Sequence, residues 1–193
     1  TGLVLTGGGA RAAYQVGALR AIAELHPANT PFQVVAGTSA GAINSAAVAI
    51  HADEFQVGMA HLTATWRSLA PDQVYRTDIR SVASIGASWL RQLSAGGWLG
   101  PAKVNALLDT TPLRRLLRST LAMPRIRDHV QSGRLRGAAV TATGYHSGTA
   151  LTFFDAAPEV APWFRSSRIG VRARLGVEHV LASSAIPIFF PPV

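Results

Sequence analysis

The stretch VVAGTSAGAINSAAV (Val34–Val48) passes from an apolar run, through small residues, into an alanine-rich run. Phe32–Ala36 predicts a strand, and the residues from Ser39 to about Ile50 predict a helix. A sharp strand-to-helix turn that exposes a serine hydroxyl is a nucleophile elbow, and flanking glycines let strand and helix approach closely. The stretch predicts Ser39 as a nucleophile, with Gly37 and Gly41 as the elbow glycines. The alternative is an ordinary helix start, with Thr38 or Ser39 as its N-cap.

A second glycine-rich stretch, GGGARAAYQVGAL (Gly7–Leu19), follows the strand-like residues Leu3–Leu5. Four apolar residues then recur at helical spacing and predict one helix face: Ala12, Val16, Leu19 and Ala23. Two buried strands joined by such a helix imply a right-handed crossover in a parallel sheet. The first 50 residues therefore predict an α/β fold, and residues 53–110 are expected to form helices and loops that cover the sheet or its mouth.

The glycines of this second stretch leave backbone N–H groups unobstructed at a helix N-terminus, where partial positive charge favours an anion. That arrangement suits the oxyanion of an acyl-transfer reaction. Arg11 stands in the first helical turn, where the macrodipole disfavours a cation, so it points to an anion nearby. We predict an oxyanion hole at Gly7, Gly8, Gly9 and Arg11, with a solvated arginine as the alternative for Arg11.

The same glycines also satisfy the G-x-G-x-x-A pattern of a dinucleotide site. The second strand, however, ends at Ala36-Gly37 without the acidic residue that would hold a ribose, and no Lys-Ser/Thr pair follows the glycines. Cysteine is absent, which excludes a thiol nucleophile and cysteine metal sites. We therefore expect no cofactor and no metal.

The amino-acid composition restricts the classes of protein to which the chain can belong. Hydrophobic residues make up 48% and charged residues 15% of the chain, which favours one folded domain, and no apolar run approaches the roughly 20 residues of a membrane helix. The net charge of +8 is almost all arginine. Contact with an anionic membrane is one interpretation, and a general preference for arginine over lysine is the other.

A non-catalytic, basic lipid-binding module is a second hypothesis for the whole chain. Its basis is a set of arginines and a set of apolar residues: Arg114, Arg115, Arg118, Arg125, Arg127, Arg165, Arg168, Arg172 and Arg174, with Trp89, Leu90, Leu93 and Trp98. Such side chains could rest on a membrane interface, or form a solvated face and a packed core. Nucleic acid is not expected as a partner, because recognised binding motifs and interleaved stacking aromatics are missing.

The second half of the chain predicts a helix, a hairpin and a final short helix. Thr111-Pro112 starts the first helix, with threonine as its cap. Arg136–Thr143 and Ala150–Asp155 are strand-like and joined by GYHSG. The stretch EHVLASSAIPIFFPPV (Glu178–Val193) predicts a short helix followed by an apolar strand or loop.

Three blocks of this chain, in this order, resemble the patatin-like phospholipase family. They are GGGARAAYQVGAL, GTSAGAIN (Gly37–Asn44) and ASSAIPIFFPPV (Ala182–Val193). The resemblance implies a three-layer α/β/α fold with a mainly parallel central sheet, in a single catalytic domain over residues 1–193. It also implies hydrolysis of phospholipid or another lipid ester, in the cytoplasm or at a membrane surface. Ser39 would be the nucleophile, with Gly8, Gly9 and Arg11 around the oxyanion.

The family resemblance implies a Ser-Asp dyad whose aspartate lies in an Asp-Gly-Gly or Asp-Gly-Ala motif. The sequence contains no Asp-Gly pair, so we expect the domain to be truncated before that motif and the aspartate to follow Val193. The enzymatic alternative is an α/β-hydrolase triad of Ser39, Asp155 and His179, which have the required chain order. Against the triad, Ser39 follows the glycines by only 30 residues, which is one βα unit.

Overall fold

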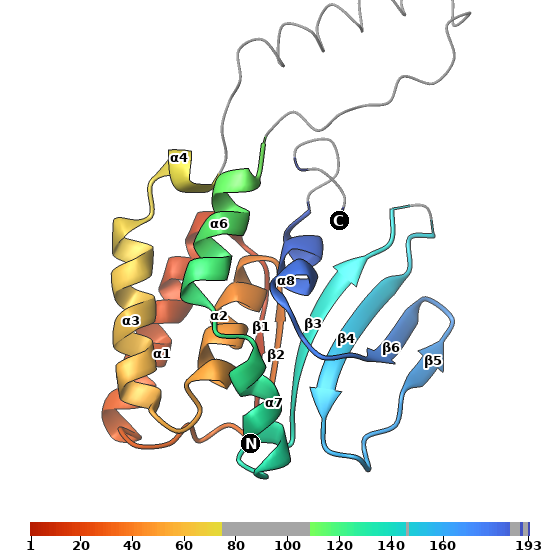
Figure 1. Cartoon of the computed structure of the whole chain (residues 1–193), viewed down its shortest axis with the longest axis horizontal. Helices are drawn as coiled ribbons and strands as arrows, with labels where there is room; N and C mark the ends of the chain where they lie inside the picture. The colour runs from red at the N-terminus through yellow and green to blue at the C-terminus, as the bar shows by residue number, and fades with distance from the viewer. Residues whose placement is uncertain (75–108, 146, 186–189, 191–192) are drawn as a thin grey trace, which may run out of the picture.

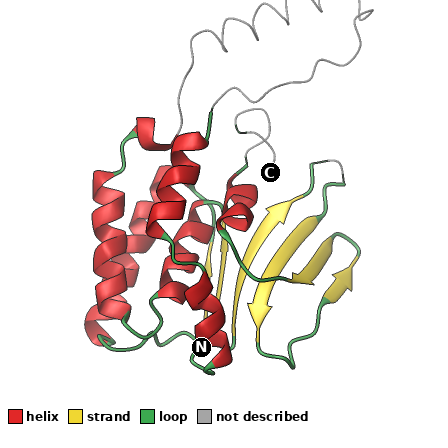
Figure 2. Cartoon of the chain, in the orientation of Figure 1, coloured by secondary structure: helices red, strands yellow, loops and turns green. Residues whose placement is uncertain are grey.

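The computed structural model describes residues 1–74, 109–145, 147–185, 190 and 193. Its centre is a six-stranded sheet in the order β1-β2-β3-β4-β6-β5. The strands are β1 (Gly2–Leu5), β2 (Val34–Thr38), β3 (Gly137–Thr143), β4 (Ala150–Ala156), β5 (Trp163–Arg165) and β6 (Arg168–Arg172). Three of the five neighbouring pairs are parallel, and the pairs β3–β4 and β5–β6 are antiparallel. The predicted α/β class, parallel β1–β2 unit and β3–β4 hairpin are confirmed (Figure 2).

The helices gather beside the N-terminal strands (Figure 1). They are the 3₁₀ helix η1 (Gly9–Ala12), α1 (Ala13–Leu25), α2 (Ala40–Ile50), α3 (Phe55–Ser68), α4 (Pro71–Val74), α6 (Thr111–Thr120), α7 (Pro124–Gln131) and α8 (Val177–Ser184). α2 is the central helix and packs on β1, β2 and β3. Its alanine-rich sequence explains that position, because small side chains let the helix lie close to the sheet while almost every residue is buried.

The core lies between α2 and one face of the sheet. Leu5, Val35 and Val140 point into it and are buried. Strand residues of alternate position face the other way, and there Val4 is 76% and Val34 is 41% exposed. In the part of the chain that the structure describes, the helices therefore cover the face that carries Leu5 and Val35.

Several predicted boundaries are wrong by one or two residues, and two of these differences have a visible cause. β2 begins at Val34 instead of Phe32, whose ring packs edge-on against Phe55 with the ring centroids 6.2 Å apart. Thr111 is the first helical residue of α6 and not its cap; Thr110 is the N-cap, and Asp109 Oδ1 accepts hydrogen bonds from the Thr111 amide and hydroxyl. The predicted apolar residues Trp89, Leu90, Leu93 and Trp98, and most of the final proline-rich block, lie outside the described residues.

Candidate active site

Ser39 occupies the turn between β2 and α2. Its φ is 55° and its ψ is −125°, and it is the only non-glycine residue with positive φ among those described. Such a conformation costs on the order of 1–3 kcal/mol and persists only where the surroundings enforce it. Ser39 stands at the N-cap position of α2, yet its side chain makes no capping hydrogen bond. An ordinary capped helix start therefore does not describe this turn.

Gly37 and Gly41 are places where the backbone leaves no room for a side chain. A Cβ on Gly37 would overlap the Gly41 carbonyl oxygen and Ser45 Oγ, and would lie 2.6 Å from the Gly41 carbonyl carbon. A Cβ on Gly41 would overlap the Leu5 carbonyl oxygen. The first turn of α2 thus presses against the ends of both β1 and β2, which is the close approach that the two glycines predicted.

Ser183 holds the backbone of this turn from the other side. The Ser39 amide donates to Ser183 Oγ at 2.7 Å, and that hydroxyl donates to the Thr141 carbonyl oxygen at 2.6 Å. One hydroxyl on α8 thereby joins the end of β2 to the end of β3. Sequence reasoning placed Ser183 in a matching block but gave it no role, because its partner is 144 residues away.

The glycine loop lies next to Ser39. A Cβ on Gly7 would lie 3.2 Å from Ser39 Cβ and 3.9 Å from Ser39 Oγ, so the loop passes the serine at van der Waals distance. Gly9 has a φ of +54°, a conformation that favours glycine. Gly8 precedes η1, and its carbonyl oxygen accepts a hydrogen bond from the Arg11 amide at 3.1 Å.

All five residues from Gly7 to Arg11 are exposed to solvent. The predicted oxyanion glycines are therefore accessible, and Gly7 is the one that the structure places against Ser39. Arg11 forms no ion pair within the described ranges. An anion near Arg11 remains a prediction.

Asn44 connects the glycine loop to the elbow helix, and sequence reasoning missed it. Its buried amide donates to the Ala12 carbonyl oxygen at 3.2 Å and to Gln15 Oε1 at 3.0 Å. Its own oxygen accepts from Trp66 Nε1 at 2.8 Å. Gln15 Nε2 in turn donates to the Thr6 carbonyl oxygen at 2.8 Å, at the start of the loop. The available signal was a polar residue in the middle of an alanine-rich helix.

A cavity of about 540 Å³ has Ser39, Gly9 and Ala10 in its wall. The rest of the wall is mostly apolar and comes from α2, α3 and α6. It includes Ile43, Ala47, Leu62, Trp66, Leu113 and Leu117. A volume in this range, apolar walls and one hydroxyl at a strained turn are the features of a pocket for a small or chain-like apolar ligand.

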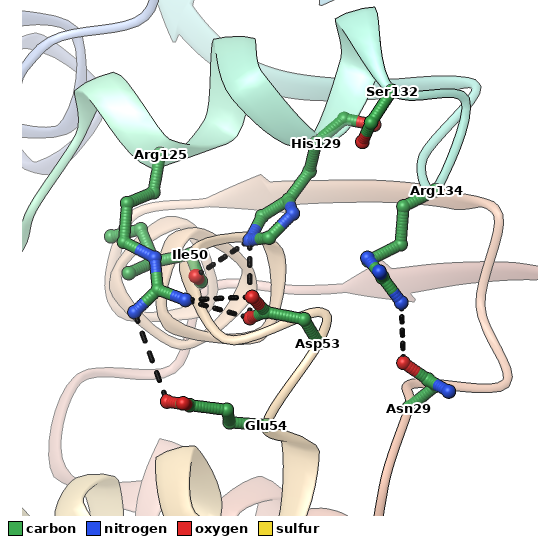
Figure 3. A network of polar contacts seen from close by, with 8 residues as sticks. All are labelled: Asn29, Ile50, Asp53, Glu54, Arg125, His129, Ser132 and Arg134. Atoms are coloured by element: carbon green, nitrogen blue, oxygen red, sulfur yellow. Dashed lines mark hydrogen bonds and ion pairs between the residues drawn. The ribbon is translucent and has the colours of Figure 1, made fainter.

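The far end of α2 is fixed by a polar cluster (Figure 3). Arg125 Nη2 donates to both carboxylate oxygens of Asp53, at 2.7 and 2.9 Å. His129 Nε2 donates to the Ile50 carbonyl oxygen at 3.1 Å and lies 3.4 Å from Asp53 Oδ1. Burial alone would raise the pKa of Asp53, but its backbone hydrogen bond and the charges of His129 and Arg125 outweigh burial and lower it.

The structure does not assemble the alternative triad. Asp155 is buried and accepts a hydrogen bond from Arg127 at 2.6 Å. In the sheet, Asp155 lies opposite Ala138 on β3. Ser39 lies near Thr141, which is three residues further along β3, or about 10 Å along the strand from Ala138. His179 Nδ1 accepts a hydrogen bond from the Gly176 amide at 3.0 Å, at the start of α8. Each residue therefore has a structural partner that is not Ser39.

Many of the arginines behind the lipid-binding hypothesis already have protein partners. Arg114 and Arg118 both donate to Glu178, which joins α6 to α8. Arg172 lies over the Phe154 ring and donates to carbonyl oxygens at the end of β4 and in the loop that follows, including that of Ala156 at 2.6 Å. With Arg125 and Arg127, five of the nine arginines named above are engaged in this way. Their number alone therefore does not indicate a binding surface.

Within the described ranges, no group of three or more His, Asp or Glu side chains could hold a metal ion. None of the helices that the structure describes has the length and apolar character needed to cross a membrane.

Comparison with known proteins gives one decisive match. Curated proteins gave no match. Among solved structures, the type III effector protein ExoU is 18% identical, with a TM-score of 0.42 over 81% of this chain and 36% of that chain. ExoU in its complex with SpcU from Pseudomonas aeruginosa is 16% identical, with a TM-score of 0.47 over 99% and 39% of the two chains. This chain spans less than two-fifths of those ExoU chains. A family model described as patatin-like phospholipase matches residues 3–193, and the chain therefore belongs to the patatin-like phospholipase family.

Proposed function

We propose that this chain is a serine lipid acyl hydrolase, of phospholipase A type or an esterase, with Ser39 as its nucleophile. Membership of the family supports hydrolysis of lipid acyl esters in general. The observation that carries the proposal is the position of Ser39, at a strained turn in the wall of an apolar cavity. The hydroxyl can meet an ester carbonyl there while the acyl chain occupies the cavity.

Acylation begins when Ser39 Oγ attacks the ester carbonyl carbon and gives its proton to a carboxylate base. The carbonyl oxygen becomes an oxyanion, and we assign its stabilisation to the amides of Gly7, Gly8 and Gly9, with Arg11 contributing positive charge. One well-placed donor is worth about 3 kcal/mol of barrier. The base returns the proton to the leaving alcohol, and an acyl-Ser39 ester remains. Water then attacks this ester, loses its proton to the same base, and releases the fatty acid as Ser39 regains its proton.

The base in this proposal is the aspartate of a Ser-Asp dyad. Ser39 has no aspartate hydrogen-bonded to it among the residues that the structure describes. Asp155 does not fill the role, because Arg127 already binds its carboxylate. An aspartate is a weak base, so this chemistry depends on a preorganised and partly dry site.

The substrate class that we propose is a phospholipid or another lipid ester. A substrate held in a membrane would bring the protein to the membrane surface. The turn between β5 and β6 offers exposed side chains for such a contact, namely Phe164, Arg165 and Arg168. An aromatic ring flanked by cations suits the interface of an anionic membrane.

Ester hydrolysis by the full-length protein tests the proposal. We expect nitrophenyl esters and phospholipid vesicles to be hydrolysed by the wild type and by Ser132→Ala, whose exposed serine lies at the end of α7. Ser39→Ala should lose at least about a thousandfold in kcat, because no other hydroxyl replaces the nucleophile. Equal rates for Ser39→Ala and the wild type would remove Ser39 from the mechanism, and the absence of hydrolysis by both would favour the non-catalytic lipid-binding module.

A further inference from the structure

The cavity that contains Ser39 continues along the whole length of α2. Its α2 wall is made by Ala40, Ile43 and Ala47, which share one helix face, and it ends at His51. A helix rises 1.5 Å per residue, so His51 lies about 18 Å from Ser39 along the helix axis. A cavity of about 540 Å³ that extends over this length is narrow, and its shape suits one extended hydrocarbon chain.

The far end of the cavity is polar, in contrast to its walls. His51 and His61 both line it, with ring centroids 6.0 Å apart and the rings nearly perpendicular. α3 makes room for the first of these rings with a glycine. A Cβ on Gly58 would overlap Cβ and Cγ of His51 and would lie 2.9 Å from its Cδ2. Glycine inside a helix costs roughly 0.5–1 kcal/mol, so helix stability does not account for Gly58, whereas the space that His51 needs does.

The backbone of His51 is hydrogen-bonded, but its side chain has an unpaired nitrogen in the described part of the chain. Its Nδ1 is buried and unsatisfied there. Burial, followed by the charges of Arg125 and His61, lowers the pKa of His51 below its ordinary value of 6.5. The ring is therefore neutral at pH 7 and can form a hydrogen bond with an uncharged hydroxyl group. His51 also lines the cavity, so its unpartnered imidazole is available to a ligand group at that end.

We propose that the cavity binds an acyl chain that carries a hydroxyl group at its far end, and that His51 recognises this hydroxyl. The inference rests on the proposed function, because the ester or carboxylate end of the acyl chain must lie at Ser39. It adds to that function the chemical group at the opposite end of the acyl chain. The substrates of this class are esters of ω-hydroxylated fatty acids, with the hydrocarbon part held between α2 and α6.

Binding of free fatty acids tests the proposal without any hydrolysis. The affinities of lauric, myristic and palmitic acids and of their ω-hydroxy counterparts for the full-length protein are measured by calorimetry. We expect the ω-hydroxy acid whose length reaches His51 to bind about threefold to tenfold more tightly than its plain counterpart, the range for one hydrogen bond. His51→Phe should abolish this preference, because phenylalanine keeps the ring shape without the polar atoms. His51→Gln should keep part of it.

The matched control is His26→Phe, which removes an exposed imidazole just after α1 and should leave the preference unchanged. Equal binding of the plain and ω-hydroxy acids by the wild type would overturn the proposal, since a terminal hydroxyl would then gain nothing from His51. So would a preference that survives in a folded His51→Phe protein, or the failure of every acid to bind. The two proposals can be tested separately. A preference for ω-hydroxy acids without any ester hydrolysis would contradict the proposed hydrolase activity and support the proposed binding site.

Discussion

At the scale of the residue, the conformation of Ser39 depends on one hydroxyl contributed from far along the chain. The Ser39 amide donates a hydrogen bond to the Ser183 hydroxyl, which in turn donates to the Thr141 carbonyl oxygen on β3. A residue at φ 55° has no intrinsic reason to stay there, so the hydrogen bond from its amide is part of what enforces the turn. Ser183 is therefore a positioning residue for the proposed nucleophile.

Ser183→Ala should lower kcat for ester hydrolysis by about tenfold or more, with little change in KM. The substitution leaves the partly buried Ser39 amide without its acceptor, and an unsatisfied group of this kind costs roughly 1–3 kcal/mol. Part of that cost can be relieved only by relaxation of the turn, which moves Ser39 Oγ away from its productive position. Steady-state kinetics of the wild type and the variant give the two parameters separately.

Ser183→Thr is the conservative control, because it retains the hydroxyl and should recover most of the lost kcat. Thermal unfolding of both variants shows whether the effect is confined to the turn. If Ser183→Ala kept the full kcat, the turn would be held by its glycines and by α2 alone, and Ser183 would have no positioning role.

At the scale of the element, α1, α2 and α3 meet at the Asn44 side chain. The amide bonds the end of η1 and a side chain of α1, and its oxygen accepts from Trp66 on α3. Asn44 is 0% exposed, so water does not reach its own side chain. The glycine loop is thereby tied to the helix that Ser39, the proposed nucleophile, precedes.

Asn44→Ala should lower the free energy of unfolding by roughly 2–3 kcal/mol, because it leaves Trp66 Nε1 and Gln15 Oε1 without their part-buried partner. Urea denaturation measures the change. Asn29→Ala is the matched control: that exposed amide accepts from Arg134 in a surface loop and should matter by less than about 0.5 kcal/mol. Equal effects of the two substitutions would show that the buried network contributes nothing particular.

Elements with strong local patterns could be predicted from the sequence, whereas their exact limits could not. β1, α1, α2 and the β3–β4 hairpin follow from apolar spacing and turn residues that lie close together in the chain. Phe32 looked like the start of β2, but its packing on Phe55 holds it outside the sheet. Asp109 accepts the hydrogen bonds at the start of α6 that a threonine cap was expected to make. In both cases a neighbour outside the local pattern set the boundary.

At the scale of the whole molecule, the difference between local patterns and contacts from distant residues also separates the predicted site residues from the missed ones. The tight turn at Gly37, Ser39 and Gly41 could be predicted because it is built within a few residues, where the required small side chains are visible in the sequence. Ser183 and Asn44 could not, because their roles depend on partners brought together only by the folded sheet and helices. The polar cluster at the C-terminal end of α2 is another such case, and it bears on the stability of the entire fold (Figure 3).

That cluster should make the protein sensitive to acid. The pKa of Asp53 is lowered from its ordinary value of 3.8 in the folded protein: burial opposes this, but its backbone hydrogen bond and the charges of His129 and Arg125 outweigh burial. A lowered carboxyl pKa stabilises the fold above pH 3.8, and the stabilisation is lost as pH falls through the folded value. Asp53→Asn should therefore lower the free energy of unfolding at neutral pH by about 1 kcal/mol.

Urea denaturation of the wild type and Asp53→Asn, repeated from neutral pH down to about pH 3, tests this linkage. The two curves should converge as the pH falls, because the protonated wild-type carboxyl no longer differs in charge from the amide. Asp53→Asn should still lose some stability in acid, since hydrogen bonds from Arg118 and Arg114 outweigh burial and lower the pKa of Glu178 as well. Glu24→Gln, in an exposed pair with Arg20, is the control and should follow the wild type. Parallel curves for Asp53→Asn and the wild type would mean that Asp53 does not couple proton binding to folding, and that the C-terminal end of α2 is held by packing and the His129–Ile50 hydrogen bond.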